Sequence, residues 1–198
     1  EPLRGGNLGM PKAPGPVEEI WDRAPVKRTP VEWALRWVWN HPEVTLLLSG
    51  MNEESHIEEN LSIAGEALPG SLSEEELALV GEAALKYREL MKIGCTSCGY
   101  CMPCPEGVAI PSCFEIYNKM HLFGNTREAL MLYAMRHGGV LRMGATNFAS
   151  QCVECGRCLE KCPQGLPIPA LLKQVAAELE IPGLEDRVAE MRKALHAE

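Results

Sequence analysis

The sequence lacks any apolar run long enough to cross a membrane. Its uninterrupted apolar stretches, such as VTLLL at 44–48, fall well short of the roughly 20 residues that a spanning helix needs, and no cleavable signal is visible at the N-terminus. Basic residues are also few, with 19 Lys and Arg against 27 Asp and Glu and a net charge of −8. No basic stripe is present to follow a phosphate backbone. We therefore expect a soluble cytoplasmic protein that binds neither membranes nor nucleic acid.

Cysteine, by contrast, is plentiful and clustered. The chain has nine cysteines, and eight of them fall in two short segments. A secreted disulfide scaffold would have an even number in a shorter chain, so the clustering indicates metal ligation instead. The candidate ligands are Cys95, Cys98, Cys101, Cys104, Cys152, Cys155, Cys158 and Cys162.

The second cysteine segment has the spacing C-x2-C-x2-C-x3-C-P over residues 152–163. This is the spacing of bacterial ferredoxin loops, in which three thiolates bind one iron–sulfur cluster and the fourth binds a second cluster. A zinc site of four cysteines normally uses two C-x-x-C pairs separated by a longer insertion. The spacing therefore favours iron–sulfur clusters, and a zinc-stabilised interaction module is the alternative.

The first cysteine segment, residues 95–105, follows the same plan except that its last gap is one residue shorter. If the two segments cross in the ferredoxin manner, each supplies three ligands to one 4Fe-4S cluster and one ligand to the other. One cluster is then held by Cys95, Cys98, Cys101 and Cys162, and the other by Cys104, Cys152, Cys155 and Cys158. The ninth cysteine, Cys113, lies in a helical pattern and is predicted to be a buried small hydrophobe.

Local patterns outside the cysteines predict a mainly α chain. Capping boxes at Thr29/Glu32 and Ser73/Glu76 predict helices that begin there, while EVTLLLS at 43–49 predicts a strand buried on both faces. We expect a linking helix within 71–94, with Leu77, Val80, Ala84, Tyr87 and Met91 on its packed face. Asn125 and Gly138 are the expected start and stop of a further helix.

The half of the chain from 95 to 198 shows no strand pattern, and helical patterns fill the long stretch between the two cysteine segments. It resembles the α-helical ferredoxin arrangement of iron–sulfur subunits such as those of succinate dehydrogenase and heterodisulfide reductase. The resemblance implies an α-helical ferredoxin-like domain with two 4Fe-4S clusters.

Residues 1–70, with EPLRGGNL and ALRWVWNHPEVTLLLSGMNEESHIEEN, resemble the last two β/α units of an aldo/keto reductase. That family is a TIM barrel that binds NADPH at the C-terminal ends of its strands. With CTSCGYCMPCPEGVAIP added, the chain is similar to a bacterial subgroup of such oxidoreductases that carry a C-terminal iron–sulfur domain. The fold class expected is therefore residual β/α units of a TIM-barrel C-terminus followed by an α-helical ferredoxin-like domain.

The aldo/keto reductase resemblance also implies nucleotide contacts. Pro2, Leu3, Arg4 and Gly6 match the loop along the cofactor pyrophosphate. Gly50, Met51 and Asn52 match the loop near the adenosine 2′-phosphate, and Glu59 and Asn60 match the pair that reads the adenine. Many relatives have a basic or amide side chain around Ser55 and His56, so the choice between NADH and NADPH stays open. A solvated helix face is the alternative for Glu59 and Asn60.

The family's catalytic tetrad of Asp, Tyr, Lys and His belongs to earlier strands, so no catalytic residue is assigned in this chain. Two strands cannot close an eight-stranded barrel. We therefore interpret the chain as the C-terminal portion of an oxidoreductase. Its expected partners are an upstream barrel portion, in the same protein or in a separate chain, and an unknown redox partner. The alternative is a stand-alone ferredoxin-like electron-transfer protein.

Overall fold

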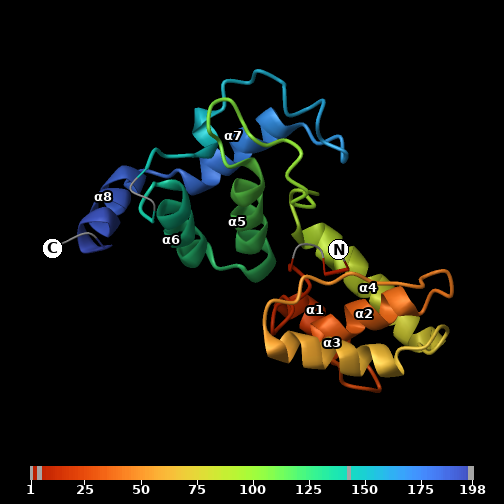
Figure 1. Ribbon diagram of the computed structural model, residues 1–198. Coiled ribbons are helices and arrows are strands. Elements are labelled where there is room, and N and C mark those ends of the chain that lie inside the picture. The colour runs from red at the N-terminus through yellow and green to blue at the C-terminus, as the bar shows by residue number, and fades with distance from the viewer. Residues whose placement is uncertain (1, 4–5, 142–143, 196–198) are drawn as a thin grey trace. The chain divides into compact units, whose positions relative to one another are not determined.

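The computed structural model describes residues 2–3, 6–141 and 144–195, and every regular element within these ranges is a helix. The chain divides into two compact units, Glu1–Glu89 and Leu90–Glu198. Figure 1 shows α1 to α4 in the first unit and α5 to α8 in the second. The expectation of a mainly α protein is thus confirmed. Within the described ranges, no helix has the length and apolar character needed to cross a membrane.

The first unit contains α1 (Gly15–Trp21), α2 (Pro30–Trp39), α3 (Glu54–Glu66) and α4 (Glu74–Leu90). Helix α2 begins where the sequence predicts, because the Thr29 hydroxyl accepts a hydrogen bond from the Glu32 N–H at 3.1 Å. The rings of Trp21 and Trp33 stack with centroids 4.6 Å apart, which joins α1 to α2. Leu35 of α2 packs against α3 in a small buried cluster.

The predicted strand at 43–49 does not form within the described chain. The segment carries no strand assignment, and the side chains of Leu46 and Leu48 are each 76% exposed. A strand is stable only when its backbone pairs with a neighbouring strand. The regular elements described in this unit are all helices, so none of them can pair with the segment. The apolar pattern is real, but the partner that it requires is not supplied by the described residues.

Helix α4 begins at the predicted capping box, which is confirmed in both directions. The Ser73 N–H donates to the Glu76 carboxylate at 2.9 Å, and the Glu76 N–H donates to the Ser73 hydroxyl at 3.2 Å. Of the predicted packed face, Tyr87 is buried as expected. The other buried residues of α4 are Glu76, Leu79 and Ala83, each one position before a predicted residue. Glu76 is held inward by Arg28, and this contact turns its side of the helix toward the unit.

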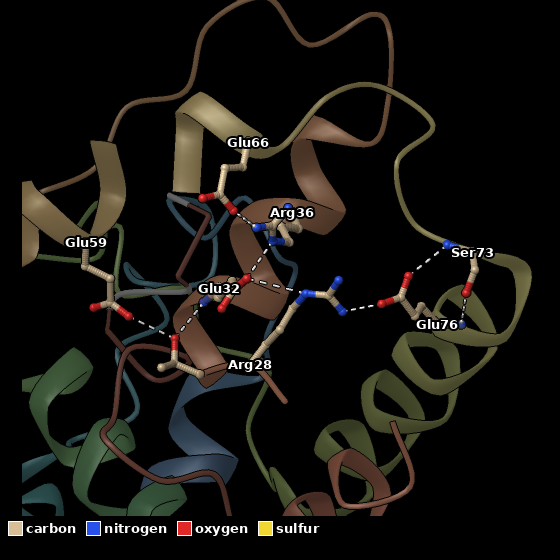
Figure 2. Close-up of polar contacts among 8 residues, drawn as sticks. Arg28, Glu32, Arg36, Glu59, Glu66, Ser73 and Glu76 are labelled. Carbon is tan, nitrogen blue, oxygen red and sulfur yellow. Dashed lines mark hydrogen bonds and ion pairs between the residues drawn. The ribbon is translucent and has the colours of Figure 1, made fainter. Parts of the chain in front are cut away.

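Among the described residues of the first unit, Arg28 and Glu76 form the most buried ion pair. Their side chains are 10% and 7% exposed, and Figure 2 shows the Glu76 carboxylate between Arg28 and Ser73. Burial alone would raise the pKa of Glu76, but the hydrogen bonds from Ser73 and Arg28 outweigh it, so this pKa is lowered. Glu32 pairs with Arg28 at 3.4 Å and with Arg36 at 2.7 Å, which extends the network over α2.

We expect Glu76→Gln to lower the free energy of unfolding of the first unit by about 2–3 kcal/mol at pH 7, because it leaves the buried Arg28 short of a carboxylate. A carboxyl whose pKa is lowered by folding stabilises the fold above its unfolded pKa and loses this effect as the pH falls through its folded pKa. The difference between wild type and variant should therefore shrink below about pH 4.5. Urea unfolding followed by tryptophan fluorescence measures it, since all four tryptophans lie in this unit.

Glu66→Gln is the matched control. Glu66 pairs with Arg36 at 2.7 Å, but its side chain is 68% exposed. Solvent screens such a pair, so the variant should cost less than about 1 kcal/mol. Equal losses in the two variants would contradict the importance of the buried pair.

The second unit contains α5 (Ile110–Phe123), α6 (Thr126–His137), the short 3-10 helix η1 (Ala149–Gln151), α7 (Ile168–Leu179) and α8 (Leu184–Leu195). Helix α5 packs on α6 and α7, and α6 packs on α8. Asn125 caps α6 through the Glu128 N–H at 3.2 Å, and the helix ends at Gly138, as predicted. The core between α5, α6 and α7 includes the fully buried Phe114, Tyr133 and Leu172.

Candidate metal centre

Each cysteine segment is a loop that leads directly into a helix of the second unit. The first loop enters α5 and the second enters α7, and both helices begin at Ile followed by Pro. The match extends over C-P-x-G-x-x-I-P, which occurs at 104–111 and again at 162–169. This longer repeat is a signal that the cysteine spacing alone did not reveal. It indicates that the loop and the start of the helix are repeated as one structural element.

The two loops also follow similar backbone paths around their first three cysteines. Left-handed φ is uncommon outside glycine, yet Ser97 and Glu154 adopt φ of 58° and 57° at matched positions, two residues after the first cysteine of each loop. Three further features recur in pairs: the left-handed glycines Gly99 with Gly156 and Gly107 with Gly165, and the 2.9 Å turn bonds Met102 N–H to Gly99 O and Leu159 N–H to Gly156 O. The shared backbone features indicate that the two loops present their first three cysteines in a similar way.

The eight cysteines line two cavities, and the grouping is the crossed one. Four thiols line the first cavity: Cys95, Cys98, Cys101 and Cys162. The second cavity, of about 450 Å³, is lined by Cys104, Cys152, Cys155 and Cys158, and Cys101 lines this cavity as well as the first. The last cysteine of each loop therefore lies with the first three of the other loop. The shorter last gap, which contains a cis Met102–Pro103 peptide bond, still places Cys104 in the second cavity.

The exposure of the cysteines repeats between the two groups. Cys98 and Cys155, at matched positions of the two loops, are exposed. The other six are half-buried and pack against the core of the unit: Cys95, Cys101, Cys104, Cys152, Cys158 and Cys162. Each group thus has three sulfurs against the core and one at the surface.

Burial raises the pKa of several of these thiols. The pKa of Cys101 rises to about 11, and those of Cys95 and Cys158 are also raised. After burial, neighbouring thiolates contribute, including Cys162 acting on Cys95 and Cys104 acting on Cys158. Cys158 likewise acts on Cys101, so the thiols of the two loops lie close together. Because a metal cluster binds thiolates, its assembly must displace the protons of these cysteines.

The donor set fits iron–sulfur clusters. Within the described ranges, no group of three or more His, Cys, Asp or Glu side chains is arranged to hold a single metal ion. A 4Fe-4S cluster is bound differently, by four thiolates spread around its surface. The eight cysteines are spread in this way around two cavities.

A buried amide anchors the chain just before the first loop. Asn118 of α5 is 3% exposed. Its Oδ1 accepts from the Ile93 N–H at 2.9 Å, and its Nδ2 donates to the Ile93 carbonyl at 2.7 Å. Ile93 lies two residues before Cys95, so this pair of hydrogen bonds sets the direction in which the first loop leaves the core.

A tyrosine and a carboxylate anchor the chain before the second loop. The Tyr133 hydroxyl donates to Glu180 Oε1 at 2.7 Å and accepts from the Ala149 N–H at 2.8 Å. The Ser150 N–H donates to the same Glu180 oxygen at 3.0 Å. Cys152 follows two residues later. None of these anchors could be predicted from local sequence patterns, since nothing local in the chain pairs Asn118 or Tyr133 with residues far along it.

We expect Tyr133→Phe to lower the free energy of unfolding of the second unit by about 1–3 kcal/mol, because it leaves the buried Ala149 N–H without an acceptor. Tyr117→Phe is the control, since the Tyr117 hydroxyl donates only to the carboxylate of the half-exposed Glu178 among the bonds described. Thermal unfolding of both variants measures the difference. A loss in Tyr117→Phe as large as in Tyr133→Phe would contradict a special role for the Ala149 anchor.

The ninth cysteine is buried as predicted. Cys113 is fully buried on α5, with its sulfur 3.9 Å from the Tyr133 hydroxyl. Burial raises its pKa to about 12, which keeps it a protonated thiol.

The predicted nucleotide contacts lie in the first unit, and their role stays a prediction. Leu3 packs against the Leu35 cluster, Gly6 adopts a left-handed φ of 85°, and Arg4 lies outside the described residues. Gly50, Met51 and Asn52 are exposed in the non-helical segment before α3.

The pair predicted to read the adenine lies on α3 and contacts the protein. Asn60 is 8% exposed and donates to the Ser49 hydroxyl at 3.2 Å, so a solvated face is the wrong description of this residue. Glu59 accepts from the Thr29 hydroxyl at 2.9 Å, at the start of α2 (Figure 2).

Comparison with known proteins agrees with the geometry of the cysteines. A family model described as a 4Fe-4S dicluster domain matches residues 94–166, a range that contains all eight clustered cysteines. No curated protein and no solved structure matches the chain. The chain therefore carries an iron–sulfur domain at residues 94–166.

Proposed function

We propose that the second unit holds two 4Fe-4S clusters and passes electrons between a donor and an acceptor. The observation that carries this proposal is the crossed grouping of eight cysteines inside the range that matches a 4Fe-4S dicluster domain. Clusters bound in this way gain and lose one electron at a time. The eight cysteines are the proposed ligands, in the two sets of four that line the cavities.

The surroundings of the cysteines suit electron transfer. Ile110, at the start of α5, lines both cavities, so the two sites are neighbours. Phe114 and Ile168, each 1% exposed, line the first cavity and keep water from its inner side. Exposed Cys98 and Cys155 bring one edge of each site to the surface. An electron can thus enter at one surface edge and leave at the other.

We further propose that the first unit is part of an aldo/keto-reductase-like, NAD(P)H-dependent barrel whose catalytic tetrad lies outside this chain. The sequence resemblance supports this, and so does the exposed apolar segment at 43–49. Leu46 and Leu48 would be buried if a neighbouring strand of a barrel paired with that segment. The whole protein would then be an oxidoreductase, with the iron–sulfur unit exchanging electrons with an external redox partner.

Anaerobic purification with iron, zinc and acid-labile sulfide analysis tests the cluster proposal. We expect a brown protein with about eight irons and about eight sulfides per chain. About four irons would mean that only one site assembles. A colourless protein with about two zinc ions and no labile sulfide would replace the proposal with a zinc-stabilised module.

The barrel proposal needs a separate test. The chain should be expressed with and without the coding sequence that precedes it, and each product mixed with NADH or NADPH under anaerobic conditions. We expect nicotinamide oxidation and bleaching of the cluster absorbance only in the longer product. An upstream sequence without barrel strands and a Tyr, Lys and His set would contradict the proposal and favour a stand-alone electron-transfer protein.

A further inference from the structure

We propose that the two cluster sites are electrostatically unequal, and that Arg157 and Lys161 give the cluster held by Cys104, Cys152, Cys155 and Cys158 the higher reduction potential. The inference rests on the proposed function, because it concerns the same two sites. It adds a direction: an electron that reaches the domain comes to rest at this second site.

The charged residues are distributed unequally between the two cavities. The second cavity is lined by Arg157, Lys161 and Glu106, which give it one net positive charge from side chains other than cysteine. In the described ranges, the first cavity has no charged residue in its lining apart from the cysteines. Its polar side chains are Thr96 and Gln164, and apolar residues such as Phe114 and Ile168 complete it.

This difference lies in the side chains rather than in the backbone. The two loops follow similar paths around their first three cysteines, as the matched φ values at Ser97 and Glu154 indicate. At the positions that match Arg157 and Lys161, which directly precede the third and fourth cysteines, the first loop has the neutral residues Tyr100 and Pro103. Tyr100 and Pro103 also line the second cavity, so the positive charge of this cavity comes from the second loop alone.

Positive charge beside a cluster favours its reduced form. Reduction adds one electron to an already anionic group, so nearby cations stabilise the reduced state more than the oxidised state. Arg157 and Lys161 are exposed, so solvent and salt weaken the effect. We expect each of them to change the ratio of reduced to oxidised cluster between about threefold and tenfold, and a tenfold change is about 59 mV for one electron.

A redox titration of the anaerobically purified chain, followed by electron paramagnetic resonance, tests the inference. We expect two separate one-electron steps. Lys161→Gln and Arg157→Gln should each lower the reduction potential of the upper step and leave that of the lower step unchanged. The expected shift corresponds to a fall of about threefold to tenfold in the ratio of reduced to oxidised cluster. Lys193→Gln, an equal charge change at an exposed position on α8, should move neither step.

Two reciprocal variants sharpen the assignment. Glu106 and Gln164 occupy matched positions, and Glu106 lines the second cavity while Gln164 lines the first. Glu106→Gln should therefore raise the upper step, and Gln164→Lys should raise the lower step. The shifts in all four variants should shrink at 1 M salt, because surface charges are then screened.

The outcomes separate this inference from the function on which it rests. A protein with about eight irons whose two clusters titrate together would overturn the inference and leave the proposed function standing. The same holds if Lys161→Gln and Arg157→Gln move the lower step, or neither step. Absence of labile sulfide would overturn both.

Discussion

Replacing Cys98 and Cys162 together with alanine is expected to cost the protein one cluster rather than two. The two cysteines belong to different loops, but they line the same cavity. If each loop instead bound its own cluster, this double variant would damage both sites. The crossed arrangement predicts a fall from about eight irons to about four, with the remaining iron held by the other site.

A second double variant gives the opposite result and serves as the control. Cys155 and Cys162 lie on the same loop but in different cavities. The crossed arrangement predicts that Cys155→Ala with Cys162→Ala removes both clusters, whereas the uncrossed one predicts loss of a single cluster. Iron and sulfide analysis of both double variants decides between the two arrangements. Equal iron content in the two would contradict the crossed grouping.

Removing the clusters is expected to destabilise the second unit by about 5 kcal/mol or more while leaving the first unit folded, because the free energy of metal binding is also free energy of folding. Six of the eight cysteines pack against the core formed by α5, α6 and α7, so losing the clusters loosens the loops that cover this core. Cys95, Cys101 and Cys158 then revert to thiols whose pKa burial has raised, and burying a thiol supplies little stability in return.

Hydrogen exchange with and without clusters measures this effect. Amides of α5 and α7 should lose protection after oxidative removal of iron by a chelator, while amides of α2 and α4 should keep theirs. Tryptophan fluorescence should report an unchanged first unit, since the four tryptophans all lie there. Unfolding of both units together, or unchanged protection in α5, would contradict the prediction.

Most of the fold could be predicted because its signals are local. The Ser73–Glu76 box and the Asn125 cap each act within three residues, so they operate wherever the rest of the chain lies. The spacing of the cysteines is equally local, and it indicated the type of metal centre and the segment that bears it. The repeat C-P-x-G-x-x-I-P was present in the same lines of sequence and could have been found there.

Predictions failed or fell short where a distant partner decides the outcome. The run at 43–49 has the composition of a strand, but a strand needs a neighbour that no local pattern can supply. The packed face of α4 was misplaced because Glu76, a charged residue, is buried by its contact with Arg28, 48 positions earlier in the chain. The anchors at Asn118 and Tyr133 were missed for the same reason.

The sequence by itself determined that the protein is mainly helical, where its capped helices begin, and that the eight clustered cysteines lie in an iron–sulfur domain. Only the tertiary structure decided which cysteines share a cavity, which charged loop residues line the second cavity, and which buried side chains hold the loops. The physical reason is range: capping and ligand spacing act over a few residues, whereas grouping depends on how α5 and α7 pack and bring two loops together that are about fifty residues apart in the chain.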